Sequence, residues 1–193
     1  MADPPPNIFH WDFESDDIRE FFDESPDRGI AISLPAILDN RLGSILRASM
    51  RADEKVLNEM FQPSGPLGSF KTKINMAYML GFIDKEFFLD LVTILRIRNH
   101  FAHKLKIKSL EQSPIKDWIK GMSLYAVVIG VRNKIPTPED PEPKKFAYAL
   151  MNAELMTMRD CFRICIRFMI LRLNEIETYL KAQKANLKSG NQP

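Results

Sequence analysis

Polar side chains interrupt the apolar pattern of residues 84–103, which predict a helix because Asp84 suits an N-cap and neither glycine nor proline follows it. Arg98 and Asn99 fall on the helical lines that otherwise carry Leu91 and Leu95, where core residues are expected. A guanidinium group can bind an anion, and the imidazole of His103 can exchange a proton near neutral pH. Because an unpaired buried polar group costs about 1–3 kcal/mol, these groups are predicted to have partners in the core or at an interface.

One candidate partner is Asp39, on a predicted long helix over residues 26–51. It lies in line with the apolar residues Ile32 and Leu42, which predicts that it faces the interior. We therefore expect Asp39 to be a buried partner of Arg98. The alternative is a carboxylate at the edge of the apolar stripe that pairs with Arg41 or with water.

The remaining helices are predicted from caps, breakers and apolar spacing. They cover residues 16–24, 53–61, 70–80, 113–120 and 144–184, with Pro35 expected to bend the helix over 26–51. Residues 122–131 are rich in valine and isoleucine and are predicted to be extended or irregular. The fold class is therefore all-α, a single-domain multi-helix bundle with a long C-terminal helix. Residues 1–15 are predicted to be a disordered or acidic lead-in, 16–185 the helical domain, and 186–193 a disordered tail.

The net charge of +2 hides an asymmetry along the chain. Residues 1–27 hold nine acidic residues and one arginine, so that they carry −8, while the remainder holds 26 basic and 16 acidic residues and carries +10. An acidic arm on a basic body can bind its own surface or screen a site for an anionic partner. An acidic, solvated lead-in is the simpler alternative.

The composition argues against several classes of site. Three histidines and two cysteines cannot supply a zinc-site spacing, so that neither a metal nor another cofactor is expected. Cys161 and Cys165 lie one helical turn apart, which does not suit a disulfide but does suit a reducing cytoplasm. The N-terminus has no features of a secretory signal, and the apolar run 161–171 contains two arginines and is too short to span a membrane. The same run is apolar nearly all round, which predicts a homodimer.

Residues 75–95 superficially have the spacing of a helix-turn-helix motif. The second helix would have to read DNA, but Phe87, Leu91 and Ile94 mark it as a core helix. A recognition helix needs polar residues that face base edges. This interpretation is therefore rejected.

Several segments together resemble the mannitol operon repressor family. They are DRGIAISLPAILDNRLGSIL (27–46), GPLGSFKTKINMAYMLGFID (65–84), IRNHFAH (97–103) and a C-terminal helix after a proline-rich linker. The resemblance implies a bacterial, cytoplasmic, all-helical regulator of transcription that lacks a recognised DNA-binding motif. The most specific block begins with candidate structural or partner-binding residues, namely Gly65, Pro66, Leu67, Gly68, Ser69 and Phe70.

A shorter resemblance lies within the first. Arg98 and His103 fit the motif of an arginine, four residues and a histidine that is found in HEPN domains, several of which are metal-independent ribonucleases. This resemblance implies a catalytic set of Arg98, Asn99 and His103, with histidine as general acid or base and arginine stabilising charge on a phosphate. Arg98 and His103 lie about 140° apart around an ideal helix, so that they converge only if the helix end distorts or a dimer partner supplies one of them. The alternative is that these residues tie helices together and cap the helix end.

Three functions therefore remain open. The first is a repressor that acts through a regulatory protein partner or through DNA or RNA. The second is a HEPN-type ribonuclease, which leaves open whether the chain is an enzyme. The third is a non-catalytic scaffold for protein interactions.

Overall fold

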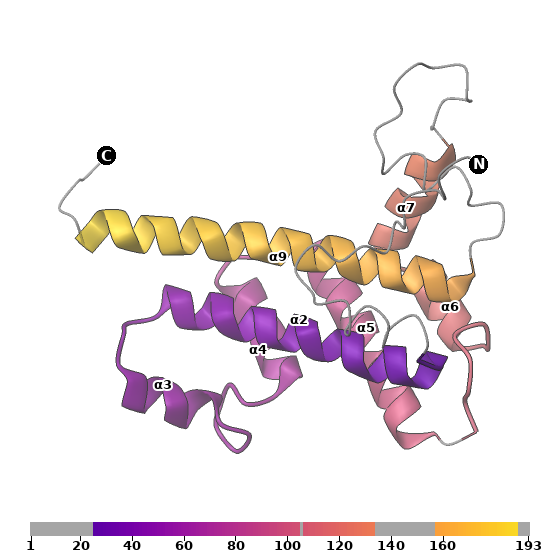
Figure 1. Cartoon of the computed structure of the whole chain (residues 1–193), viewed down its shortest axis with the longest axis horizontal. Helices are drawn as coiled ribbons and strands as arrows, with labels where there is room; N and C mark the ends of the chain where they lie inside the picture. The colour runs from indigo at the N-terminus through magenta and orange to yellow at the C-terminus, as the bar shows by residue number, and fades with distance from the viewer. Residues whose placement is uncertain (1–24, 105, 134–156, 189–193) are drawn as a thin grey trace, which may run out of the picture.

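Two long helices, α2 (Asp27–Ser49) and α9 (Met158–Lys188), form the centre of the molecule. The computed structural model describes residues 25–104, 106–133 and 157–188. The two helices lie side by side and run in the same direction, from right to left in Figure 1. Their facing sides are built from fully buried apolar residues, among them Ile30, Leu34, Leu38, Leu42, Phe162, Cys165, Met169 and Leu173. Removing this apolar surface from water is the main force that holds the pair together.

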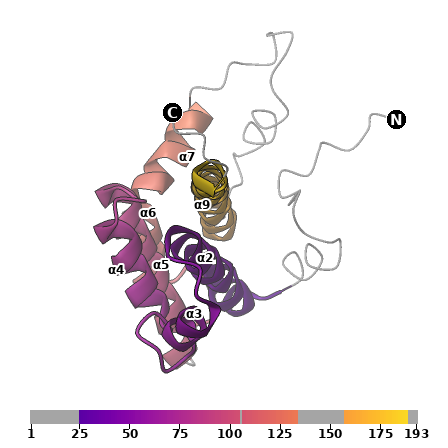
Figure 2. The same ribbon diagram turned by 90° about the vertical axis from the view of Figure 1, so that its left-hand side faces the viewer.

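Five further helices pack around this pair in the described part of the chain: α3 (Glu54–Phe61), α4 (Phe70–Met79), α5 (Lys85–His103), α6 (Ile115–Lys120) and α7 (Ser123–Asn133). In Figure 2 α4 and α5 lie to the left of α2, and α9 lies above it. The predicted all-α fold with a long C-terminal helix is therefore confirmed. None of the described helices is long and apolar enough to cross a membrane.

The helix starts predicted at Ser69 and Asp84 are also confirmed, whereas α2 begins at Asp27 with no side-chain cap. The carboxylates of Asp53 and Asp84 and the hydroxyl of Ser69 each accept a hydrogen bond from a backbone N–H three residues later. These bonds satisfy donors that have no partner within the helix. Gly81 ends the α4 region with φ of +74°, a left-handed conformation that favours glycine.

The prediction for residues 122–131 was wrong, because α7 covers most of them as a helix. Its start is stabilised by Asp90 of α5, whose carboxylate oxygens accept from the backbone N–H groups of Ser123 at 2.9 Å and Leu124 at 2.8 Å. Burial raises the pKa of Asp90, against the opposing effect of these two hydrogen bonds. A cap supplied from more than 30 residues away outweighs the preference of valine and isoleucine for strands.

The C-terminal helix also differs from its prediction. It continues to Lys188, beyond the expected end at residue 184 and into the predicted tail. Its start is a reciprocal cap in which the Thr157 N–H donates to Asp160 and the Asp160 N–H donates to the Thr157 hydroxyl. The predicted helical residues 144–156, the acidic helix 16–24 and the lead-in 1–15 lie outside the described residues.

The apolar run 161–171 is largely buried within the chain itself. Leu171 is 42% exposed, whereas Cys161, Phe162, Cys165 and Ile166 are at most 1% exposed. Cys161 and Cys165 are both buried, and burial raises the pKa of the Cys165 thiol strongly. The run therefore leaves little apolar surface for a second copy, and the homodimer stays a prediction.

Candidate functional site

The three predicted catalytic residues lie at the C-terminal end of α5, but not in the core. Arg98 is half-buried, while Asn99 and His103 are exposed. Of the two environments predicted for Arg98 and Asn99, the core is therefore wrong, and an interface stays a prediction. The core side of α5 instead carries Leu91, Ile94, Ile97 and Phe101, each fully buried. With these side chains in the core, the helix buries more apolar area than it would with Leu95 and Ala102 there. This difference determines which side of α5 faces the core.

The polar contacts of this end of α5 are few. A guanidinium nitrogen of Arg98 (Nη1) donates to the Asn99 side-chain oxygen at 3.4 Å, a long hydrogen bond. In the described part of the chain no hydrogen bond or ion pair joins Arg98 to His103. Their catalytic role stays a prediction.

An arginine and a tryptophan that the sequence reasoning missed lie beside these residues. The guanidinium carbon of Arg96 lies 3.8 Å from the centroid of the Trp118 ring, and the His100 ring meets the same tryptophan edge-on at 5.2 Å. The pairing joins α5 to α6 and holds the Arg96 side chain in place. Arg96 and Trp118 are 22 residues apart, so that no local spacing indicates the contact.

Asp39 pairs with Lys73. The prediction that it pairs with Arg98 was therefore wrong. The lysine Nζ lies 2.7 Å from a carboxylate oxygen of Asp39, and the two side chains are 10% and 28% exposed. The pair links α2 to α4 across partly buried surface. Lys73 is itself among the buried residues of α4, which explains why the chain places a carboxylate opposite it.

The block Gly65–Phe70 forms a tight loop that ends at the first residue of α4. Leu67 and Phe70 are buried and anchor it, and the Leu67 N–H donates to the Met60 carbonyl at 2.8 Å. A Cβ atom at Gly68 would overlap the carbonyl oxygens of Gln62 and Pro63, and one at Gly65 would overlap those of Glu59 and Met60. The two glycines are therefore required for close backbone packing, while Pro66 and Ser69 remain exposed.

Two acidic residues near the C-terminal end of α5, and one at its start, have partners of their own. Asp27 accepts from the Arg159 guanidinium at 2.9 Å and from the Leu110 N–H at 2.8 Å. Glu111 accepts from the Met158 N–H at 2.6 Å and pairs with Lys116 at 2.9 Å. These contacts, the backbone bond first, lower the pKa of Glu111, and the Glu111 carboxylate raises the pKa of Lys116. At the opposite end of α5, the Phe87 N–H and then Arg172 lower the pKa of the Asp84 carboxyl.

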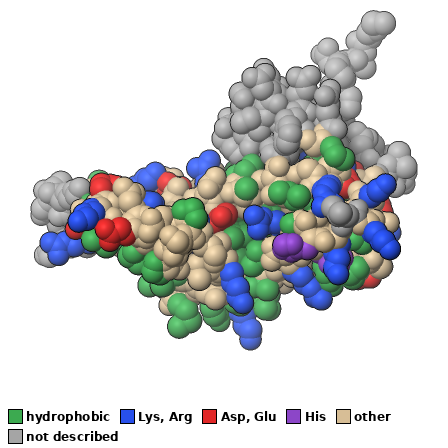
Figure 3. Space-filling model, turned by 90° about the horizontal axis from the view of Figure 1, so that it is seen from below, with side chains coloured by type: hydrophobic (Ala, Val, Ile, Leu, Met, Phe, Trp, Pro, Cys, Tyr) green, Lys and Arg blue, Asp and Glu red, His purple; other side chains and the backbone are tan. Residues whose placement is uncertain are grey.

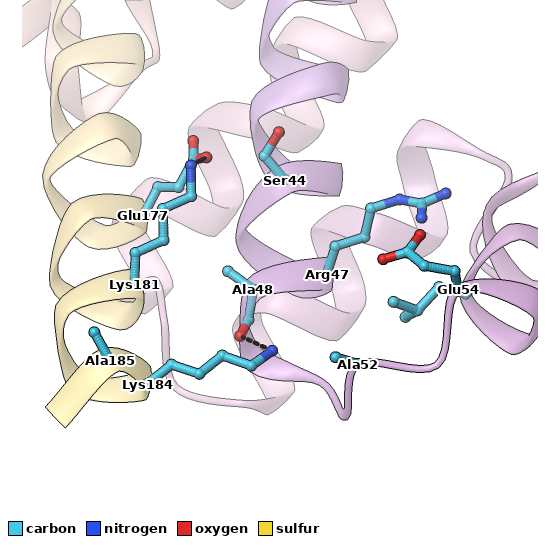
Figure 4. A pocket seen from close by; sticks show the side chains of 10 residues that line it. Ser44, Arg47, Ala48, Ala52, Glu54, Glu177, Lys181, Lys184 and Ala185 are labelled. Atoms are coloured by element: carbon cyan, nitrogen blue, oxygen red, sulfur yellow. Dashed lines mark hydrogen bonds and ion pairs between the residues drawn. The ribbon is translucent and has the colours of Figure 1, made fainter. Parts of the chain in front are cut away.

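A hollow of about 530 Å³ lies between α2, α3 and α9. Figure 4 shows Ser44, Arg47 and Ala48 on the α2 side and Glu177, Lys181 and Lys184 on the α9 side. Lys184 donates to the backbone carbonyls of Ala48 and Met50, which end α2, and Lys181 pairs with Glu177 at 2.5 Å. Lys181 is therefore neutralised by Glu177, and the Lys184 amine is held by the two carbonyls that end α2. The described residues also contain no group of three or more metal-ligating side chains.

Apolar side chains are exposed around the turn that joins α4 to α5. Met79 is 78% exposed, Leu80 48% and Leu89 49%. The rings of Tyr78 and Phe88 stack with their centroids 4.6 Å apart and join the two helices beside this turn. Neighbouring exposed apolar residues of this kind are typical of protein contact sites.

Two solved structures share the fold. The MtlR–HPr complex from Escherichia coli matches with a TM-score of 0.59 and 17% identity over 80% of this chain and 94% of that chain. A possible transcriptional regulator, YggD from Shigella flexneri, matches with a TM-score of 0.57 and 14% identity over 83% of this chain and 97% of that one.

No curated protein matches the sequence. The model of the MtlR family, described as mannitol repressor, matches residues 14–176, which include every described helix except the end of α9. As the segments 27–46, 65–84 and 97–103 predict, the chain belongs to the mannitol repressor family.

Proposed function

We propose that the chain is a bacterial, cytoplasmic transcriptional repressor that acts without a helix-turn-helix and is controlled by a regulatory protein partner. The observation that carries this proposal is the family match over residues 14–176. The solved MtlR of Escherichia coli is in a complex with HPr, which makes an HPr protein the first candidate partner for this chain as well.

The position of α5 supports a mode of action other than base reading by that helix. A recognition helix places its N-terminal half in the major groove. In this chain that half buries Phe87 and Leu91, and its outer side presents Leu89 and Val92. Leucine and valine side chains make no hydrogen bonds to base edges, so that this surface suits an apolar contact with a protein.

We place the partner contact at the α4–α5 surface, defined by Met79, Leu80, Leu89 and Val92, which are 39–78% exposed. These side chains lose water contact when a partner covers them. Burying a leucine side chain contributes about 2 kcal/mol, which corresponds to more than a tenfold change in affinity.

Calorimetric titration of the purified chain with HPr from the same organism tests the proposal. Leu89→Ser is expected to weaken HPr binding about tenfold or more, because it removes apolar area from the contact. Val56→Ser is the matched control: Val56 is 48% exposed on α3, close to the 49% of Leu89. Failure of the wild-type chain to bind HPr, or equal binding by the two variants, would contradict the proposal.

A further inference from the structure

Cations gather at the C-terminal end of α5 and in the loop that follows it. The stretch 91–110 contains Arg96, Arg98, Lys104, Lys106 and Lys108 and no acidic residue. We call these five residues the basic patch. In Figure 3 Lys and Arg side chains surround a histidine on the face seen from below, where α5 ends in Figure 1. Four of the five side chains are exposed, and Arg98 is half-buried.

The charge of the basic patch is not neutralised by the part of the chain that the structure describes. None of its five residues forms an ion pair with a described residue. The acids on either side in the sequence are engaged elsewhere: Asp90 caps α7, and Glu111 binds Lys116 and the Met158 N–H. A group of unpaired, exposed cations attracts polyanions.

Two further contacts add to the basic patch. Arg96 is held over the Trp118 ring, so that it loses less freedom when it binds a phosphate. Arg28, at the start of α2, donates to the Lys104 carbonyl at 3.5 Å and brings a sixth cation to the same place.

We infer that the basic patch binds the phosphate backbone of duplex DNA without reading its sequence. From Arg96 to Lys104 the chain rises about 12 Å at about 1.5 Å per residue, close to the width of the major groove, so that the cations can reach phosphates on both strands. Single-stranded nucleic acids usually need a free aromatic face on which bases stack, and Arg96 covers one face of Trp118. Lysines contact phosphates as point charges and carry little base specificity.

This inference goes beyond the proposed function and does not rest on it, since it is argued from the cations at the C-terminal end of α5 and in the following loop, whereas the HPr contact is placed on apolar residues nearer the start of that helix. The basic patch gives a repressor that lacks a reading helix a way to stay close to DNA, while specificity comes from a partner. Such a contact is predicted to be strongly salt-dependent, because each neutralised phosphate releases a counterion.

The test is fluorescence anisotropy of the full chain with a short labelled duplex of arbitrary sequence, between about 50 and 200 mM salt. The variant K104Q/K106Q/K108Q is expected to bind at least tenfold more weakly at the lowest salt. It should also reduce the slope of log K against log salt by about 2 to 3, since each phosphate contact contributes about 0.9. The control R51Q/K55Q/K85Q removes three exposed cations from other parts of the chain and is expected to leave affinity and slope unchanged.

The inference would be overturned by the absence of salt-dependent duplex binding by the wild-type chain, by an equal loss in the control, or by tighter binding of single-stranded RNA of the same length. Titration of K104Q/K106Q/K108Q with HPr separates the two proposals. Unchanged HPr affinity together with weakened DNA binding supports the inference. Weakened HPr affinity with unchanged DNA binding would make the basic patch a protein contact and overturn it.

Discussion

Gly68→Ala is expected to lower the free energy of unfolding by about 3 kcal/mol or more, measured by urea denaturation and far-UV circular dichroism. The added methyl group would overlap two backbone carbonyl oxygens, those of Gln62 and Pro63, at the end of α3. Backbone atoms cannot move aside as a flexible side chain can, so that the loop must open. Opening it displaces Leu67 and Phe70 from the core.

Gly130→Ala is the control for this substitution. Gly130 lies within α7, and a Cβ atom there meets no atom within 4 Å. Alanine is the better helix former, so that this variant is expected to gain about 0.5–1 kcal/mol. A Gly68→Ala variant as stable as the wild-type protein would contradict the close packing of the loop.

Asp39→Ala is expected to cost about 2–3 kcal/mol of stability, measured in the same way. The substitution leaves the Lys73 ammonium group, whose side chain is 10% exposed, without its partner at 2.7 Å. The partial exposure of Asp39, at 28%, keeps the cost below that of a fully buried pair.

Replacing both members of the pair separates a lost charge partner from lost packing. The double variant Asp39→Ala/Lys73→Met removes the buried charge and is expected to recover most of the loss. Arg172→Met provides a contrast, because Arg172 and Asp84 also lie close, at 2.6 Å, but are 50% and 52% exposed. We expect it to cost less than about 1 kcal/mol. Equal costs for Asp39→Ala and Arg172→Met would contradict a special role for the Asp39–Lys73 pair.

The helix boundaries could be predicted where the determining residue is local. Asp53, Ser69 and Asp84 each cap a helix within three residues of their own position. The helix α7 could not be predicted in this way, because its cap comes from Asp90 on another helix. For residues 122–131 the sequence offered only the preference of valine and isoleucine for extended structure, whereas the segment is a helix.

The candidate site depended more on tertiary packing than on spacing. Two apolar lines run along α5, and a rotation of the helix by about 100° decides whether Arg98 or Ile97 faces the core. The partner of Asp39 follows from the packing of α4 against α2, which the sequence does not encode at any fixed spacing. The basic patch shows the same principle: its charges are visible in the sequence, but their isolation from acidic partners is visible only in the fold.

The family resemblance was carried by the segments 27–46, 65–84 and 97–103 and is confirmed by the family match. The structure gives physical reasons for part of this agreement. Gly65 and Gly68 allow the tight loop before α4, and Asp39 neutralises Lys73. These roles concern the fold of the domain, whereas the exposed α4–α5 surface and the basic patch are where contacts with partners are proposed.

The most direct test of the proposed repressor is a transcript measurement in the source organism. The chromosomal copy is deleted and replaced with the wild-type sequence, Leu89→Ser or Val56→Ser, and RNA abundance is compared across the genome. We predict that a defined group of transcripts rises on deletion, falls again with the wild-type sequence and Val56→Ser, and stays high with Leu89→Ser. An unchanged transcript profile on deletion, or full repression by Leu89→Ser, would contradict a repressor that acts through the α4–α5 surface.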